Sequence, residues 1–343
     1  MSSITIKEIA KALNVSISTV SKALNDSHEI GEKTKKRVLE YAEAHHYKPN
    51  LLAQNLKTGK SNTIGVILTS INNPFCSQII EGIQQHALKV GFEVIFMQSR
   101  ENPEIERSCI ETLMQRGVDG LLISPVDETS NQKLLEDIHD HNFPVVIFDR
   151  IQHNLETFKI GVNNFQGAYL ATKHLIDSGR TKIVNITASR FGLSGERFKG
   201  YHQALTNAGI AFDDQFHIQC NMQNQEVLDV ELKNAITRLM NAENKPDAIL
   251  GSSDTITVTL LGVLAELGYS VPDELAVIGF SNIDFARSLN PALSTIRQPA
   301  LEIGDMAMEK LMKFIAKKNW HQVQIETTEL DTILTFRKSS IQS

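Results

Sequence analysis

Near the start of the chain, apolar residues recur at three- and four-residue steps, the spacing that places side chains on one face of a helix. Helices are expected over 6–13 and 15–25, and Asn14 between them tolerates the left-handed backbone of a tight turn. Ser16 is a favourable N-cap for the second helix. A third helix over 32–45 would close a small core over the first two. Its apolar positions are Val38, Leu39, Tyr41 and Ala42.

The second helix has an outer face of short or basic side chains, as a surface that enters the DNA major groove requires. These outer residues are Ile17, Ser18, Ser21 and Lys22. The pattern predicts a helix-turn-helix in which Ile17, Ser18 and Lys22 read base edges. Phosphate contacts are expected from the hydroxyl and amide side chains of Thr5, Ser16, Thr19, Ser21, Asn25 and Thr34.

From residue 62 onward, short β-branched and apolar runs alternate with amphipathic helical stretches, which predicts parallel sheets covered by helices on both faces. A first series has expected strands over 64–68, 93–97, 120–124 and 145–148 and expected helices over 75–90, 104–115 and 132–141. A second series follows Arg150. It has expected strands over 159–162, 182–186, 216–219, 248–251 and 275–280 and expected helices over 165–178, 195–208, 226–241 and 256–267. Two successive α/β lobes imply a cleft between them.

The distribution of charge supports a DNA-binding head, although the net charge of −6 alone would argue against one. Residues 1–60 hold ten Lys or Arg and six Asp or Glu, a net charge of +4, so the remainder carries −10. A basic head on an acidic body suits DNA binding whose affinity falls as salt rises.

Composition predicts a soluble, globular protein of two or three domains, since the chain has 343 residues of which 41% are hydrophobic. No apolar run reaches the ~18 residues of a membrane span, and no signal-peptide segment begins the chain. A cytoplasmic protein without a membrane partner is therefore expected. Cys76, Cys109 and Cys220 have no metal-type spacing, and their odd number argues against a disulfide framework.

The sequence contains no recognisable catalytic, cofactor or metal motif. Residues 59–61 resemble the end of a phosphate-binding loop, but Gln54 stands where that motif needs glycine. Residues 192–195 lack the Gly-x-Ser-x-Gly spacing of a hydrolase nucleophile elbow. We therefore expect a protein that is not an enzyme and has no cofactor.

Several stretches in a fixed order resemble the lactose-repressor (LacI/GalR) family of bacterial transcription regulators. They are 5–10, 15–16, 18–25, 34–38, 47–50, 53–56 and 64–67, and the resemblance extends to Phe336. It implies a three-helix helix-turn-helix domain over 1–48, a hinge helix and linker over 49–61, and a two-lobed, periplasmic-binding-protein-like domain over 62–343. In this α/β arrangement, lobe 1 would comprise about 62–160 and 293–322, and lobe 2 about 161–292 and 323–343. Residues 291–298 would cross between the lobes, helix 300–314 would return to lobe 1, and 324–334 would supply terminal strands to lobe 2.

The segment 51–56 is too short to be a stable helix alone in water. In the family that the chain resembles, such segments fold on the operator, and paired copies from a dimer enter the minor groove. The residues in this position are Asn50, Ala53, Gln54 and Leu56. Leu56 would wedge the central base step and kink the DNA, whereas packing of Leu56 on the body is the alternative. A homodimer predicts a palindromic operator.

Ligands of open α/β sheets bind beyond the carboxyl ends of the strands. The residues there are hydroxyls, amides, carboxylates and aromatic rings, a set that suits a polyhydroxylated ligand such as a sugar. The candidate effector contacts are Asn73, Phe75, Ser124, Asp149, Arg150, Asn163, Phe191, Arg197, Asp254 and Asn282. Core packing of Phe75 and loop capping by Asp149 remain alternatives.

Arg197 is expected in the first turn of a helix capped by Ser194, where a cation opposes the helix dipole. Helix stability therefore does not explain it, and the resemblance implies a ligand-contacting arginine there, with a structural salt bridge as the alternative. The pairs 253–254, 281–282 and 163–164 depart from the family's more carboxylate-rich pattern. Nucleosides and other polar metabolites therefore stay open beside sugars.

These features together predict a ligand-regulated repressor in which closure of the lobes changes the pairing of the two hinge segments. The sequence leaves open whether the ligand releases or promotes DNA binding. A solute-binding protein and an enzyme with a DNA-binding head are the alternatives. The basic head argues against the first, and the missing phosphate-binding loop argues against the second. The absence of a heptad-patterned tail favours a dimer over a tetramer.

Overall fold

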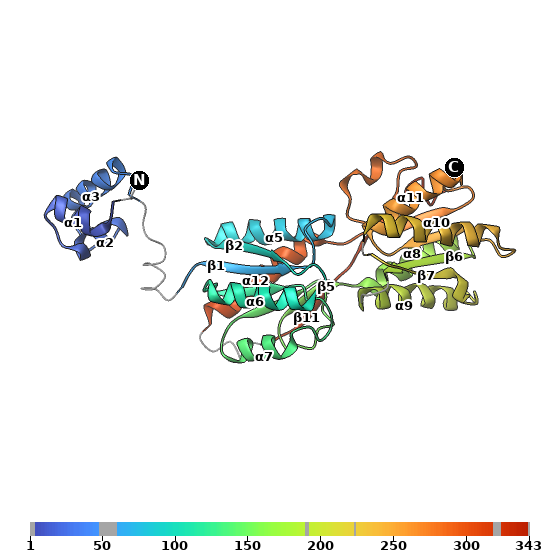
Figure 1. The fold of residues 1–343 in the computed structure, drawn as a ribbon, viewed down its shortest axis with the longest axis horizontal. Helices are drawn as coiled ribbons and strands as arrows, with labels where there is room; N and C mark the ends of the chain where they lie inside the picture. The colour runs from blue at the N-terminus through green and yellow to red at the C-terminus, as the bar shows by residue number, and fades with distance from the viewer. Residues whose placement is uncertain (1–3, 48–59, 189–191, 223, 318–323, 342–343) are drawn as a thin grey trace. The chain divides into compact units, whose positions relative to one another are not determined.

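The computed structural model describes residues 4–47, 60–188, 192–222, 224–317 and 324–341. The chain divides into two compact units, Met1–Ser61 and Asn62–Ser343 (Figure 1). The predicted hinge helix, with Asn50, Ala53, Gln54 and Leu56, lies outside the described residues.

The N-terminal unit is the predicted three-helix head, with α1 (Ile6–Leu13), α2 (Ile17–Leu24) and α3 (Glu32–Ala44). Its core consists of Ile9, Ala10, Val20, Ala23, Val38 and Ala42. The predicted core position of Leu39 is wrong, since its side chain is 46% exposed. Val38 and Ala42 lie four residues apart on the inner face of α3, and Leu39 falls outside that stripe.

Local capping explains where α1 and α2 begin. The Thr5 side chain accepts a hydrogen bond from the Glu8 backbone, and the Glu8 carboxylate accepts one from the Thr5 backbone at 2.7 Å, which together form a capping box. Asn14 ends α1 in the left-handed conformation with φ of 55°, as the sequence predicts. Ser16 caps α2 by accepting from the Thr19 backbone N–H at 2.9 Å.

The C-terminal unit contains two sheets with the same strand order. The first sheet contains β1 (Thr63–Leu68), β2 (Glu93–Gln98), β3 (Gly120–Ile123), β4 (Val145–Phe148), β5 (Lys159–Val162) and β11 (Thr327–Leu330). Its order is β11-β5-β4-β3-β1-β2, and all neighbouring strands are parallel. The second contains β6 (Ile183–Ala188), β7 (His217–Cys220), β8 (Ala248–Gly251), β9 (Ala276–Phe280), β10 (Ser294–Arg297) and β12 (Ile333–Thr335). Its order is β12-β10-β9-β8-β6-β7, with β12 antiparallel to β10.

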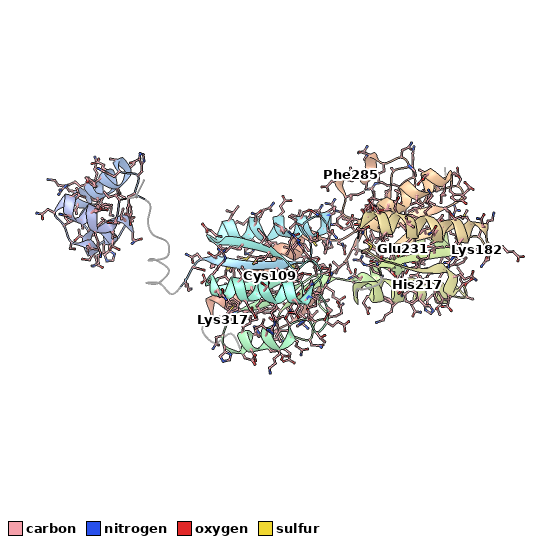
Figure 2. All side chains as sticks on the ribbon, viewed as in Figure 1. Cys109, Lys182, His217, Glu231, Phe285 and Lys317 are labelled. Atoms are coloured by element: carbon pink, nitrogen blue, oxygen red, sulfur yellow. The ribbon has the colours of Figure 1, made fainter. Side chains whose placement is uncertain are left out.

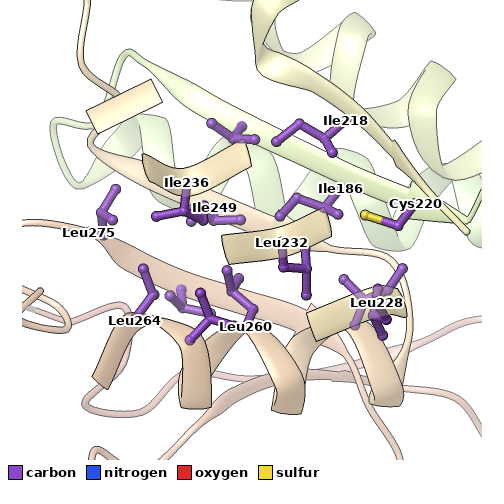
Figure 3. Close-up of a cluster of buried hydrophobic side chains, with 14 of the residues drawn as sticks. Ile186, Ile218, Cys220, Leu228, Leu232, Ile236, Ile249, Leu260, Leu264 and Leu275 are labelled. Carbon is purple, nitrogen blue, oxygen red and sulfur yellow. The ribbon is translucent and has the colours of Figure 1, made fainter. Parts of the chain in front are cut away.

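Helices cover both faces of each sheet, because successive apolar side chains of a strand point to opposite faces. In lobe 1, built on the first sheet, α5 (Pro74–Val90) and α12 (Ala300–Ala316) pack on one face, and α6 (Pro103–Gln115) and α7 (Gln132–Asp140) pack on the other. In lobe 2, built on the second sheet, α10 (Gln225–Asn241) and α11 (Asp254–Leu267) pack on one face, and α8 (Asn164–Asp177) and α9 (Gly192–Asn207) pack on the other. Short 3-10 helices span Asp214–Phe216 and Asp284–Ser288. Figure 3 shows Leu228, Leu232 and Ile236 of α10 and Leu260 and Leu264 of α11 in one apolar cluster on this face of the sheet.

The chain crosses between the lobes three times: between β5 and α8, between β10 and α12, and between β11 and β12. The return of α12 to lobe 1 agrees with the sequence prediction (Figure 1). Two strand assignments were wrong. Residues 294–297 form β10 in the second sheet instead of a bare crossing, and β11 pairs with β5 in lobe 1 instead of joining lobe 2. The first crossing also follows β5, so residues 161–162 belong to lobe 1.

All three cysteines are free and buried, as the sequence predicts, and Cys109 of α6 is labelled in Figure 2. Burial raises the pKa of the Cys76 and Cys220 thiols to about 12 in each case, which keeps them protonated. Among the described residues, no helix is both long and apolar enough to cross a membrane.

Candidate functional site

The outer face of α2 carries the predicted base-reading residues on its exposed side. Ile17 is 47% exposed, and Ser18 and Lys22 are also exposed. Lys22 forms an ion pair with Glu29, and both side chains are about half exposed. Exposed pairs of this kind are weak, so Lys22 is available to exchange Glu29 for another acceptor.

The predicted phosphate-contacting residues have local structural roles in the head. Thr5 and Ser16 are the N-caps of α1 and α2, and Asn25 donates to the Ser21 carbonyl at 2.8 Å. Thr19, Ser21 and Thr34 are partly buried. Backbone N–H groups at a helix N-terminus that no capping side chain occupies can bind phosphate. The caps are therefore compatible with phosphate contacts.

Asp149 lies at the end of β4 in lobe 1, with φ of 64°, a left-handed conformation that is uncommon for aspartate. Its side chain is buried, and Ser124 at the end of β3 donates from Oγ to Asp149 Oδ2 at 3.2 Å. Burial raises the pKa of the Asp149 carboxyl, while the positive charges of Arg150 and Arg197 oppose the rise. Arg197 belongs to lobe 2, so its charge acts on Asp149 from the other lobe.

Arg150 holds three loops of lobe 1 together. Its guanidinium donates to both carboxylate oxygens of Glu101, at 2.8 and 2.7 Å, and to the carbonyl oxygens of Pro125 and Val126. A bidentate, partly buried pair of this kind is geometrically specific. The structure therefore gives Arg150 a structural role, and its contact with an effector stays a prediction.

Arg197 is buried and joins the segments that cross between the lobes. It donates to Asn164 Oδ1 at 2.7 Å, to Gln298 Oε1 at 2.6 Å and to the Ser252 carbonyl oxygen. Its guanidinium lies 3.8 Å from the centre of the Phe280 ring. Burial lowers its pKa to about 10, and Asp149 and Asp254 oppose that change, so it remains a cation at neutral pH.

The position of Arg197 within its helix differs from the prediction. The helix α9 begins at Gly192 and not at residue 195, so Ser194 is inside the helix and Arg197 lies in its second turn. No salt bridge involves Arg197 among the described residues. Its partners are an amide, a carbonyl and a second amide, which leaves its positive charge uncompensated by a bonded carboxylate.

Asp254 starts α11 and faces the same region of lobe 2. Its Oδ1 accepts from Ser281 Oγ and from the Asn282 backbone N–H, both at 2.7 Å. Burial raises the pKa of this carboxyl, and those two hydrogen bonds together with Arg197 oppose the rise. Asp149, Arg197 and Asp254 therefore form a group of buried charges drawn from both lobes.

Four other predicted effector contacts have different surroundings. Asn73 caps α5 and Asn163 caps α8 through side-chain oxygens that accept backbone N–H groups. Phe75 is 4% exposed within the apolar core of lobe 1, which fits the alternative of core packing. Asn282 is fully buried, and its amide is hydrogen-bonded within the protein. Phe191 lies outside the described residues.

Asn164, Gln298 and Phe280 were missed by the sequence prediction although they surround Arg197. Asn164 follows the chosen Asn163 by one residue, and Gln298 ends the predicted crossing. A segment that crosses between the lobes lies close to both of them. Polar residues in such a segment were therefore the signal that could have identified Asn164 and Gln298. Among the described residues, no group of three or more His, Cys, Asp or Glu side chains is placed to hold a metal ion.

Comparison with known proteins assigns both units. Residues 5–50 match the bacterial regulatory proteins of the lacI family, and residues 172–340 match a periplasmic binding protein-like domain. The HTH-type transcriptional repressor PurR of Photobacterium profundum is 32% identical to the chain over 337 residues, or 98% of each protein.

The chain belongs to the LacI family.

Two further comparisons are consistent with this membership of the LacI family. The ribose operon repressor of Haemophilus influenzae is 32% identical over 92% of the chain and 93% of that repressor. A structure of the lac repressor dimer bound to operator and the anti-inducer ONPF covers 99% of the chain with a TM-score of 0.85, and its 23% identity supports the shared fold. As a LacI-family protein, the chain is a DNA-binding transcriptional repressor with a ligand-controlled effector domain, and it is not an enzyme.

Proposed function

We propose that this LacI-family repressor binds a palindromic operator as a homodimer in the cytoplasm and that a small polar effector between its lobes changes its affinity for DNA. The exposed outer face of α2 carries the proposal, because Ile17, Ser18 and Lys22 project from a helix that is fixed at both ends. Two copies related by a two-fold axis would present two such helices to two half-sites.

The proposed contacts sort by what they would touch. Ile17 would meet a thymine methyl and Lys22 a guanine O6 or N7, with Ser18 between them on the base edges. The residues proposed to bind phosphate are Thr5, Ser16, Thr19, Ser21, Asn25 and Thr34. The residues proposed to enter the minor groove are Asn50, Ala53, Gln54 and Leu56.

Selection of binding sites from random duplex DNA by the full chain tests this function directly. The expected product is a palindrome of about 14–20 base pairs whose affinity falls steeply with salt, because phosphate contacts release counterions. Selection is repeated with pooled sugars and nucleosides, since a co-repressor could be required. A failure to enrich any site under both conditions would reject the proposed function.

Replacing Lys22 by alanine is expected to weaken binding to the selected operator by roughly 10–100-fold, the cost of one base contact. Discrimination at a single base pair of each half-site should be lost with it. Fluorescence anisotropy on the selected operator and on its single-base variants measures both. The control is Lys133→Ala, at an exposed lysine of α7 in the body, which should bind as the wild type does. Equal weakening on every sequence would instead identify Lys22 as a phosphate contact.

The effector is proposed to be a sugar or a nucleoside, supported by two buried carboxylates and a buried arginine that converge from both lobes. Asp149 and Asp254 can each accept from two hydroxyl or amine groups, and Arg197 can donate to a ring oxygen or a carbonyl oxygen. Ser124, which donates to Asp149, is a further proposed effector contact. A thermal-shift screen of sugars, nucleosides and nucleobases should identify a compound that raises Tm, because a ligand that binds the folded state stabilises it.

A further inference from the structure

A pair of residues with side-chain amides, Gln78 and Asn282, connects the two lobes. Gln78 lies in α5 of lobe 1, and Asn282 follows β9 in lobe 2. Asn282 Nδ2 donates to Gln78 Oε1 at 2.8 Å, and Gln78 Nε2 donates to the backbone carbonyl oxygen of Asn282 at 3.0 Å. Each residue is thus both donor and acceptor, which fixes the relative orientation of the two groups.

Asn282 is engaged on every side. The second hydrogen on Asn282 Nδ2 is donated to the backbone carbonyl oxygen of Gln298 at 2.8 Å. Asn282 Oδ1 accepts from the Gln298 backbone N–H at 2.9 Å. Its own backbone N–H is bound to Asp254 at 2.7 Å. Both donors of the side chain are used within the protein, so Asn282 is better suited to position its neighbours than to contact an effector.

Gln298 links this pair to the buried arginine. Its side-chain oxygen accepts from Arg197 Nη2 at 2.6 Å, while its backbone is held by Asn282. Arg197 also binds Asn164, so it joins two of the three segments that cross between the lobes. Hydrogen bonds therefore run without interruption from Arg197 through Gln298 and Asn282 to Gln78 on α5.

We propose that the Gln78–Asn282 pair is an inter-lobe latch that holds the lobes in this arrangement and is connected through Gln298 to Arg197. The two hydrogen bonds between Gln78 and Asn282 form only while α5 and the segment after β9 are adjacent. Removing these bonds therefore shifts the equilibrium between close and separated lobes toward separated lobes. Both partners are neutral amides. The latch therefore differs from an ion pair in being insensitive to salt and to pH near neutrality.

The test measures lobe separation in the full chain by single-molecule energy transfer, without DNA or effector. Dyes are attached at Lys133→Cys in lobe 1 and Glu243→Cys in lobe 2, both exposed positions, and the three native cysteines are buried. Labelled protein is mixed with excess unlabelled chain, so that each assembly carries one labelled protomer. Because neither operator nor effector is present, the result does not depend on the proposed function.

Gln78→Ala is expected to lower the ratio of close to separated lobes by roughly 5–20-fold, the effect of two partly buried neutral hydrogen bonds. Gln78→Glu should lower it at least as far, because a carboxylate oxygen then faces the Asn282 carbonyl oxygen. The matched control is Gln84→Ala, an exposed glutamine of the same helix, which should leave the ratio unchanged. The wild-type ratio should not change with added salt.

The connection to Arg197 is tested by combining Gln78→Ala with Arg197→Met. If the four residues act as one network, the effect of the double variant should depart from the product of the single effects by a factor of about 3 or more. A wild-type ratio in Gln78→Ala, or an equal loss in Gln84→Ala, would overturn the latch. Independent effects of the two variants would overturn its connection to Arg197. Thermal unfolding of each variant identifies any that has lost its fold.

Discussion

Replacing Arg197 by methionine is expected to weaken the response of operator binding to the effector by roughly 100-fold. Methionine has a similar length but offers no donor. Asn164 Oδ1 and Gln298 Oε1 would then lose the guanidinium that donates to them, at 2.7 and 2.6 Å. Each buried amide oxygen left without its donor costs about 1–3 kcal/mol. The positive charge that faces Asp149 and Asp254 would be lost as well.

The measurement is a titration of operator binding with the sugar or nucleoside that raises Tm in the thermal-shift screen. Arg197→Lys should be nearly as impaired, because one ammonium group cannot reproduce the planar fork that reaches several partners. The control is Lys199→Met, two residues further along α9, whose exposed side chain pairs with Glu196. A wild-type response in Arg197→Met would remove Arg197 from the proposed effector site.

Replacing Gly82 by valine is expected to destabilise lobe 1 by about 3 kcal/mol, the upper range for an overpacked core. Helices α5 and α12 approach so closely that a Cβ at residue 82 would lie 2.2 Å from the Leu301 carbonyl oxygen. A Cβ at Gly304 would lie equally close, 2.2 Å, to the Ile79 carbonyl oxygen. Both atoms that would clash with the added Cβ are backbone oxygens, so a change of side-chain rotamer cannot relieve the clash. The helices would have to separate and open the core beneath them.

Thermal and urea unfolding followed by circular dichroism measure this loss. The matched control is Gly262→Ala in α11, where an added Cβ meets nothing within 4 Å. That exposed helical position should gain about 0.5–1 kcal/mol, since alanine is a better helix former than glycine. Opposite signs for the two substitutions are therefore expected. Equal stability of Gly82→Val and the wild type would show that the helices can separate at little cost.

Asp149 and the capping residues of the head show how residues proposed to bind effector or DNA are held by local structure. Asp149 has φ of 64°, and its carboxyl is oriented by Ser124. Ser16 fixes the first turn of α2, immediately before the proposed base-reading residue Ile17. A side chain or backbone segment that is ordered before a ligand binds lowers the entropic cost of binding.

Local sequence pattern determined the elements of this protein. The three helices of the head, the left-handed turn at Asn14 and the alternation of strands and helices all follow from periodicity and capping, which depend on neighbours a few residues away. The rule that ligands bind beyond the carboxyl ends of parallel strands also included Ser124, Asp149 and Asp254 among the ten predicted effector contacts. Parallel strands bring those ends together whatever their separation along the chain.

Only the tertiary structure decided which distant residues meet. Arg197 and Gln298 are 101 residues apart, and Gln78 and Asn282 are 204 residues apart. Sequence periodicity reports which face of an element is apolar, but it carries no information about the partner of a polar side chain. For the same reason it misplaced β10 and β11, because a short strand has the same pattern in either sheet. The strands and helices were therefore local properties of the sequence, and the connections between the lobes were set by long-range packing.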